Sequence, residues 1–222
     1  GYRRQRQMCI RDSTFASPYN QRPLELGADM VVSSSTKYLG GHSDIVGGSI
    51  VIKENKEYAE KISFIQNAVG AVPSPFDCYL LTRSIKTLSV RMKQHNENAI
   101  AVSNYLSNHP KIEKVFFPGN DKRHKEIAEK QMDGFGGMMS FVIDSDINGV
   151  KTFLKNLNLF TLAESLGGVE SLIEHPAIMT HASIDPSIRE KLGISETLLR
   201  ISVGIEDVDD LISDLDQALS KI

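Results

Sequence analysis

The sequence contains few cysteines, no long apolar run and no excess of charge of one sign. Cys9 and Cys78 are too few and too far apart for a disulfide framework, which favours a reducing compartment such as the cytoplasm. The longest apolar candidate, residues 45–52, contains two glycines and is shorter than the roughly 18 to 20 residues of a membrane span. With 25 basic against 28 acidic residues and no basic stripe, we expect neither nucleic acid nor a membrane as a partner.

Several motifs with a known chemistry are also missing. The chain contains neither G-x-x-x-x-G-K-[ST] nor G-x-G-x-x-G, which excludes the common nucleotide-binding loops, and it lacks the G-x-S-x-G elbow of many hydrolases. His175 and His181 lie six residues apart without the glutamate of a zincin, and His42 has no metal-ligand spacing. We therefore expect no metal site.

The length and composition indicate a soluble globular chain of one to two domains. Of its 222 residues, 41% are hydrophobic and 24% are charged, so it can bury a core without a disulfide or metal. Residues 1–11 differ from the rest, because they carry four arginines and no acid. We expect residues 1–11 to be a non-native, scar-like leader with a junction near Asp12, and the chain to be the C-terminal part of a longer protein.

The first third of the chain has an α/β pattern. Residues 24–32 and 46–52 are expected to form strands, and residues 54–66 have the spacing of a helix. Between the strands, the polar turn at residues 33–36 leads to Lys37 and then to a Gly-Gly pair.

A single long helix is predicted next. Ser74 is a suitable N-cap, with Pro75 at the first helical position and Asp77 completing a capping box. An apolar stripe then continues for about 30 residues until Asn108 and Pro110. We place a domain boundary inside this helix, near residue 83, which divides the chain into a cofactor-domain part (12–83) and a linking helix with a small domain (84–222).

The remaining sequence predicts a second α/β domain. Strands are expected at residues 115–117, 138–143 and 199–203, and helices at residues 149–157 and 208–222. Asp207 is the expected cap of the last helix.

Two residues have the properties of reactive or binding groups. Lys37 follows a hydroxyl-rich turn and precedes a glycine pair, where a desolvated amine can form an imine with a carbonyl; the alternative is a solvated surface lysine. Arg200 alternates with apolar neighbours on a strand, so it is either a bidentate clamp for a substrate carboxylate or a solvent-facing arginine.

Several segments together resemble the Cys/Met-metabolism family of pyridoxal-phosphate enzymes, which includes cystathionine gamma-lyase and gamma-synthase. The similarity runs from Asp12 to the C-terminus. Its motifs are S-S-T-K-Y-L-G-G-H-S-D (residues 34–44), G-A-V-P-S-P (70–75), K-T-L with R-M (86–92), A-E-S-L-G-G-V-E-S (163–171), P-A-I-M-T-H-A (176–182) and R-I-S-V-G (200–204).

The resemblance implies a truncated fold-type I α/β enzyme, with the end of the large cofactor domain followed by the small C-terminal domain. Lys37 would hold pyridoxal 5'-phosphate and then move protons on the substrate. Asp12 would pair with the pyridine nitrogen, and the hydroxyls of Ser34 and Thr36 would bind the phosphate, although Asp12 could instead belong to the junction and the two hydroxyls could be turn formers. The resemblance also implies substrate binding by two residues, Ser165 and Arg200.

The resemblance further implies a cytoplasmic homotetramer, a dimer of dimers, that uses an amino-acid substrate. Cystathionine gamma-lyase is our first expectation, with gamma-synthase and a non-catalytic fragment as alternatives. The chain departs from the family by having Ser13 after Asp12 where asparagine is usual, and by lacking the upstream phosphate loop, the ring-stacking aromatic residue, and the tyrosine and arginine supplied by a neighbouring subunit. We therefore predict that the chain alone is inactive.

Overall fold

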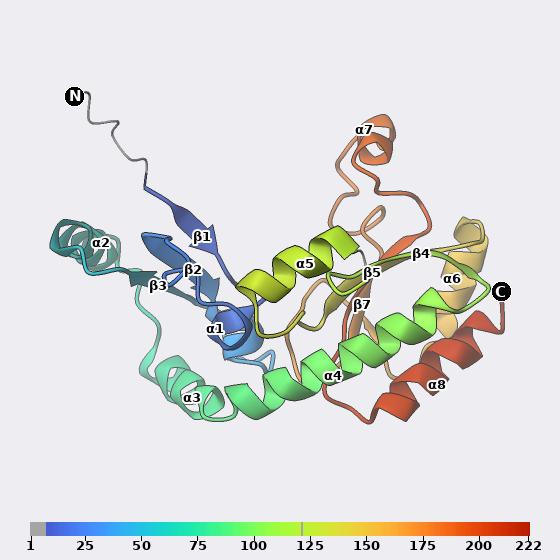
Figure 1. The fold of residues 1–222 in the computed structure, drawn as a ribbon, viewed down its shortest axis with the longest axis horizontal. Coiled ribbons are helices and arrows are strands. Elements are labelled where there is room, and N and C mark those ends of the chain that lie inside the picture. The colour runs from blue at the N-terminus through green and yellow to red at the C-terminus, as the bar shows by residue number, and fades with distance from the viewer. Residues whose placement is uncertain (1–7, 121) are drawn as a thin grey trace.

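The computed structural model describes residues 8–120 and 122–222, so residues 1–7 of the predicted leader lie outside the described residues. Two separate sheets lie side by side, and one long helix, α4 (Leu88–Ser107), runs beneath the second sheet and reaches α1 (Ser17–Asn20) next to the first (Figure 1). The arrangement is a mixed α/β fold, as the sequence predicts.

The first sheet has three strands in the order β1 (Ile10–Asp12), β2 (Met30–Ser34) and β3 (Gly48–Ile52). β1 is parallel to β2, and β3 is antiparallel to it. The predicted strand at residues 24–32 is therefore shifted toward its C-terminal end. The short helix α1 (Ser17–Asn20) follows β1, and the helical turn η1 (Ser35–Leu39) follows β2. We call residues 35–47, which join β2 to β3, the lysine loop.

The predicted single helix is wrong, because it is divided into α3 (Pro75–Ile85) and α4 (Leu88–Ser107). The Ser84 carbonyl, which would accept from Leu88 in a continuous helix, accepts instead from the Thr87 amide at 3.1 Å and hydroxyl at 3.0 Å. The Arg91 guanidinium donates to the same carbonyl at 3.0 Å. Side-chain donors thus replace the next backbone bond, and the helix ends. The predicted cap is confirmed, since Ser74 accepts from the Asp77 amide at 3.1 Å.

The apolar stripe of the predicted long helix is buried only along α4. Leu88, Met92, Ala99, Val102 and Leu106 are all buried there, whereas Ile85 on α3 is 46% exposed. α4 therefore packs against β4 and β5 of the second sheet and against α1 and η1 beside the first.

The second sheet has five strands in the order β4 (Ile112–Phe116), β5 (Met138–Ile143), β8 (Leu198–Ser202), β7 (Leu172–Glu174) and β6 (Thr161–Leu162). All neighbours are antiparallel except β6 and β7. The helices α4, α6 (Ile147–Asn156) and α8 (Val208–Leu219) bury the main hydrophobic core against the sheet. The predicted Asp207 cap is confirmed, since its carboxylate accepts from the amides of Asp209 and Asp210.

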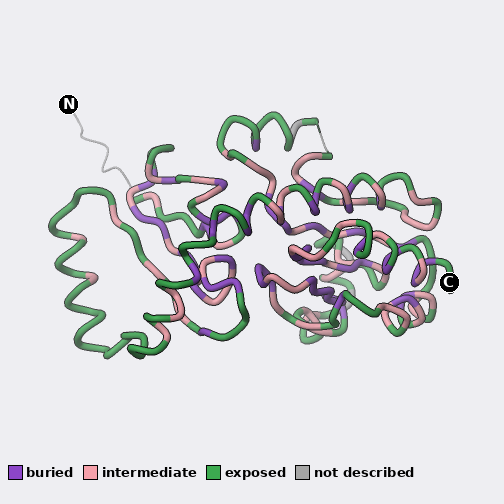
Figure 2. The backbone as a smooth tube through the Cα atoms, turned by 90° about the horizontal axis from the view of Figure 1, so that it is seen from below, coloured by how far each residue is buried: buried purple, intermediate pink, exposed green. Residues whose placement is uncertain are grey.

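The remaining helices lie at the surface. α5 (Lys122–Gln131) and α7 (Pro186–Lys191) have no counterpart in the prediction, whereas α2 (Lys56–Val69) matches the helix expected at residues 54–66. α2 has no buried residue and extends away from the rest of the chain (Figures 1 and 2). In the part of the chain that the structure describes, no helix combines the length and the apolarity needed to cross a membrane.

Candidate active site

The predicted site residues Lys37 and Ser165, 128 positions apart, meet in the structure. The Lys37 Nζ donates to the Ser165 Oγ at 3.0 Å. Lys37 interrupts the helical turn η1 with non-helical backbone angles (φ −93°, ψ −132°), and the residue is half-buried. The lysine loop and the segment after β6 therefore place an amine and a hydroxyl together between the two sheets.

A buried arginine holds the lysine loop. Arg91 on α4 donates to the carbonyl oxygens of Tyr38 at 2.7 Å and Leu39 at 3.4 Å, immediately after Lys37. At Gly41 the backbone has φ +69°, and an added Cβ would overlap the Arg91 guanidinium. Burial lowers the Arg91 pKa, yet an arginine remains charged at every physiological pH. Sequence reasoning did not find this role, since nothing in a helical stripe marks one arginine as an anchor.

The segment that carries Ser165 is fixed on two sides. The Gly167 amide donates to the Ser202 Oγ on β8 at 2.9 Å, and the Val169 amide donates to the Gly41 carbonyl at 2.9 Å. Gly167 has φ +79°, and a Cβ there would come within 2.7 Å of the Tyr38 amide nitrogen. This close approach requires glycine, and it keeps Ser165 next to the lysine loop.

Tyr38 of the lysine loop and His95 on α4 form a buried pair. Their rings meet edge to face with centroids 5.1 Å apart, and the His95 Nδ1–H donates to the Val203 carbonyl at 2.7 Å. Burial raises the pKa of the Tyr38 phenol and lowers that of His95 to about 4. Both rings are therefore neutral at pH 7, and they support Lys37 by packing.

The predicted cofactor-binding residues lie near the carboxyl ends of the parallel strands β1 and β2. Asp12 ends β1 and is exposed, and its carboxylate accepts from the Thr14 amide at 2.9 Å. The Thr14 hydroxyl in turn accepts from the Ser34 amide at 2.8 Å. Ser34 and Thr36 both place their hydroxyls by the Gly47 carbonyl, at 3.4 and 3.3 Å. In open α/β sheets, this is the edge at which ligands bind.

Arg200 lies on β8 and has an ionic partner that sequence reasoning missed. Its guanidinium pairs with the carboxylate of Glu174, which lies directly opposite it on β7. The Arg200 side chain is 26% exposed, whereas that of Glu174 is 1% exposed. In the described part of the chain, no hydrogen bond or ion pair joins the Arg200 side chain to Lys37 or Ser165. An acid at the end of the apolar run Leu172-Ile173 was the signal available in the sequence.

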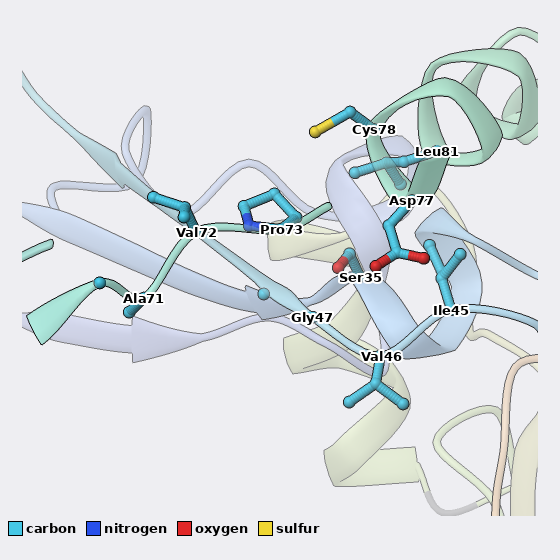
Figure 3. Close-up of a pocket in the computed structure, with 12 residues that line it drawn as sticks. Ser35, Ile45, Val46, Gly47, Ala71, Val72, Pro73, Asp77, Cys78 and Leu81 are labelled. Carbon is cyan, nitrogen blue, oxygen red and sulfur yellow. The ribbon is translucent and has the colours of Figure 1, made fainter. Parts of the chain in front are cut away.

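A cleft of about 650 Å³ opens beside the Lys37–Ser165 contact. Its lining includes Thr36, Ser165 and Glu170, so it contains two of the predicted site residues. A second hollow of about 320 Å³ shares Ile45, Val46 and Asp77 with this cleft, and Ser35 and Asp77 point into it (Figure 3). None of the predicted site residues lines the second hollow, and we therefore place the candidate site in the larger cleft.

The comparisons with known proteins agree with this arrangement. The family model for Cys/Met metabolism PLP-dependent enzymes matches residues 2–220, which include most of the predicted leader. The chain belongs to this family. Its members are PLP-dependent, which confirms the family and the cofactor inferred from the motifs.

Individual relatives of this family member cover nearly all of the chain. Cystathionine gamma-lyase of Dictyostelium discoideum is 55% identical over 212 residues, which are 95% of this chain and 54% of that protein. Cystathionine beta-lyase of Coxiella burnetii is 53% identical over 214 residues, 96% of this chain and 55% of that protein. The chain therefore spans about half the length of the curated relatives it matches.

Solved structures confirm the predicted fold class for this family member. Cystathionine gamma-synthase from Xanthomonas oryzae pv. oryzae in complex with cystathionine superposes with a TM-score of 0.90 and 46% identity, covering 96% of this chain and 55% of that one. Cystathionine gamma-lyase from Lactobacillus plantarum complexed with L-serine superposes with a TM-score of 0.90 and 47% identity. The match covers 96% of this chain and 56% of that one.

The residues present fit pyridoxal phosphate. The hydroxyls of Ser34 and Thr36 contact the Gly47 carbonyl only at long range, so both O–H donors can turn to a phosphate. The Lys37 amine donates to Ser165, which lines the cleft, and the exposed carboxylate of Asp12 is available to a ring nitrogen. Among residues 8–120 and 122–222, no group of histidine, cysteine and acidic side chains is arranged to hold a metal ion.

Proposed function

We propose that the protein carrying this chain is a pyridoxal-phosphate enzyme of transsulfuration, and that it cleaves cystathionine at the γ-carbon to give cysteine, 2-oxobutanoate and ammonia. The observation that supports this most directly is the 3.0 Å contact between the Lys37 amine and the Ser165 hydroxyl beside the cleft. Relatives named cystathionine gamma-lyase, which are 54% to 55% identical to the chain, add support.

In this proposal each site residue has one task. Bound pyridoxal phosphate supplies an electron sink that stabilises negative charge on substrate carbons. Lys37 binds the cofactor through its amine and, once released, carries protons between substrate carbons. Ser165 accepts from that amine and orients it. Arg200 binds the substrate α-carboxylate with its planar fork of donors.

The cofactor itself would be held by the residues at the ends of the first sheet. Ser34 and Thr36 donate hydroxyl hydrogens to the phosphate, and Asp12 keeps the ring nitrogen protonated. The proximity of Asp12, Thr14 and Ser34 supports this assignment.

Two other reactions have specific support. Relatives named cystathionine beta-lyase are 53% to 54% identical to the chain, and β-elimination would instead yield homocysteine and pyruvate. A structure of cystathionine gamma-synthase superposes as closely as that of the gamma-lyase, and this reaction would join cysteine to an activated homoserine. The residues of the cleft are compatible with all three reactions.

Product analysis distinguishes these reactions. The complete protein, loaded with pyridoxal phosphate, is incubated with L-cystathionine, and thiols and 2-oxo acids are separated by chromatography. Cysteine with 2-oxobutanoate supports the γ-lyase, and homocysteine with pyruvate replaces it by the β-lyase. A second reaction is supplied with cysteine and an activated homoserine, and formation of cystathionine there, without cleavage in the first reaction, favours the synthase. Absence of all these products from a cofactor-loaded protein would overturn the proposal.

A further part of the proposal concerns assembly. We propose that residues 12–83 form the C-terminal part of the large cofactor-binding domain and that residues 84–222 form a linking helix and a small C-terminal domain. We also propose that the complete protein is a cytoplasmic homotetramer. The two separate sheets joined by α4 support the division. Because the chain spans about half of its relatives, we propose that the 222 residues alone do not turn over cystathionine. Turnover by the isolated chain, measured after cofactor titration, would contradict this.

A further inference from the structure

The ion pair between Glu174 and Arg200 lies on the side of the second sheet that borders the cleft. Directly opposite residues of an antiparallel pair share a face, and so do residues two apart on one strand. Arg200 therefore shares its face with Ser202, which bonds the segment that carries Ser165. Glu174 shares the same face with Leu172, which lines the cleft. The pair is thus placed beside the candidate site without being part of the hydrophobic core.

Glu174 is held firmly in its position. Its side chain is 1% exposed, and one carboxylate oxygen pairs with Arg200 while the other accepts from the Thr180 hydroxyl. A buried carboxylate without partners is strongly destabilising, so it remains with the groups that compensate its charge. The carboxylate is therefore a fixed point to which the long, flexible arginine side chain is attached.

Arg200 keeps binding capacity after it has paired with Glu174. A guanidinium has five N–H donors, and in the described part of the chain Glu174 is the only ionic or hydrogen-bonding partner of the Arg200 guanidinium. A quarter of the Arg200 side chain remains exposed. One edge of the fork is therefore fixed to the protein, and donors remain for a second carboxylate.

We propose that Glu174 is a positioning residue: it holds the guanidinium of Arg200 in the orientation that binds the α-carboxylate of an amino-acid ligand. The inference rests on the proposed function, in which Arg200 is the carboxylate clamp. Without Glu174, Arg200 must be ordered at the moment of binding, and ordering a long side chain weakens binding. The loss should be confined to ligands that carry a carboxylate.

The test compares two ligands that differ only in that group. L-Norleucine and its decarboxylated analogue 1-aminopentane are titrated into the cofactor-loaded complete protein, and binding is followed by the change in cofactor absorption. Glu174→Ala should weaken norleucine binding about tenfold and leave 1-aminopentane within about twofold. Glu174→Gln keeps the side-chain volume and one acceptor oxygen, so its affinity for norleucine should lie between those of the alanine variant and the unsubstituted protein.

A matched control and a double-mutant cycle separate positioning from folding. Asp214 is another buried carboxylate, on α8, which accepts from three backbone amides away from the cleft. Asp214→Asn should lower thermal stability without changing the ratio of the two affinities. In an Arg200→Lys background, Glu174→Ala should weaken norleucine binding by less than about twofold, since the clamp is already lost.

The outcomes distinguish this inference from the proposed function. Equal loss of both ligands in the Glu174 variants, or a full tenfold effect in the Arg200→Lys background, would overturn the positioning role. If the protein binds the cofactor through Lys37 but its affinity for norleucine is unchanged by Glu174→Gln and Glu174→Ala, the inference alone is refuted. Failure to bind the cofactor through Lys37 would refute the proposed function itself.

Discussion

The buried His95 should make the stability of the protein sensitive to mild acid. Its ring is fully buried, its Nδ1–H donates to the Val203 carbonyl, and its Nε2 has no hydrogen-bond partner in the described part of the chain. Burial, with a smaller contribution from the charge of Arg91, lowers the His95 pKa from 6.5 to about 4. Protonation therefore favours the unfolded chain, in which the imidazole keeps its ordinary pKa of 6.5.

The size and the sign of the effect follow from this difference. At about 1.4 kcal/mol per pH unit, the neutral His95 contributes roughly 3 kcal/mol to the free energy of unfolding. The contribution is complete above pH 6.5 and is lost as the pH falls toward 4. Because His95 packs against Tyr38, next to Lys37, acid should also loosen the lysine loop.

His95→Asn tests this reasoning, since asparagine keeps a donor for the Val203 carbonyl and does not titrate. Urea unfolding of the complete protein and the variant is measured by circular dichroism between pH 8 and pH 4. The free energy of unfolding of the unsubstituted protein should fall by roughly 3 kcal/mol more than that of the variant. The difference between the two curves removes the contributions of other histidines, so parallel curves would refute the assigned pKa.

Three further substitutions address the lysine loop and the clamp, each in the complete protein. Arg91→Lys removes donors to the Tyr38 and Leu39 carbonyls, and it should cost about 2 to 4 kcal/mol in thermal stability and increase cofactor loss on dialysis; unchanged cofactor retention would argue against an anchoring role. Gly41→Ala meets both a left-handed backbone and the Arg91 guanidinium, and calorimetry should show a destabilisation of more than about 1 kcal/mol. Arg200→Lys keeps the charge and loses the fork of donors, and the loss in kcat/KM should correspond to about 1.5 to 3 kcal/mol of binding free energy. A variant as efficient as the unsubstituted protein would remove Arg200 from carboxylate binding.

Sequence periodicity predicted the elements whose packing is regular. The strand at residues 138–143 matches β5, and the apolar stripe of residues 208–222 matches α8, because each element buries one face in the same core. β6 and β7, with two and three residues, are too short to show a period. α5 was missed because its sequence is dominated by charged residues and shows little apolar spacing.

Local patterns could not predict which side chains compete for backbone groups. The break between α3 and α4 depends on three donors to one carbonyl, and one of them comes from Arg91, a full turn into the next helix. An apolar stripe in the sequence reports only which side chains face a core. The prediction based on it therefore continued the helix through Thr87.

The candidate site was predictable where a motif named it and unpredictable where a partner was needed. Lys37 and Ser165 came from two motifs 128 residues apart, and the fold brings them within 3.0 Å. The buried partner of Arg200 depends on the pairing of β7 with β8, which no local pattern specifies. Glu174 therefore became visible only with the sheet register.

The covalent attachment of the cofactor is tested most directly by reducing the complete, cofactor-loaded protein with borohydride and mapping the label by mass spectrometry after trypsin digestion. A modified Lys37 resists cleavage, so the label should appear on the peptide spanning residues 12–53. We predict that this peptide carries the reduced cofactor and that Lys37→Ala abolishes the label. A label on another lysine, or a protein that stays colourless with added pyridoxal phosphate, would contradict the role of Lys37.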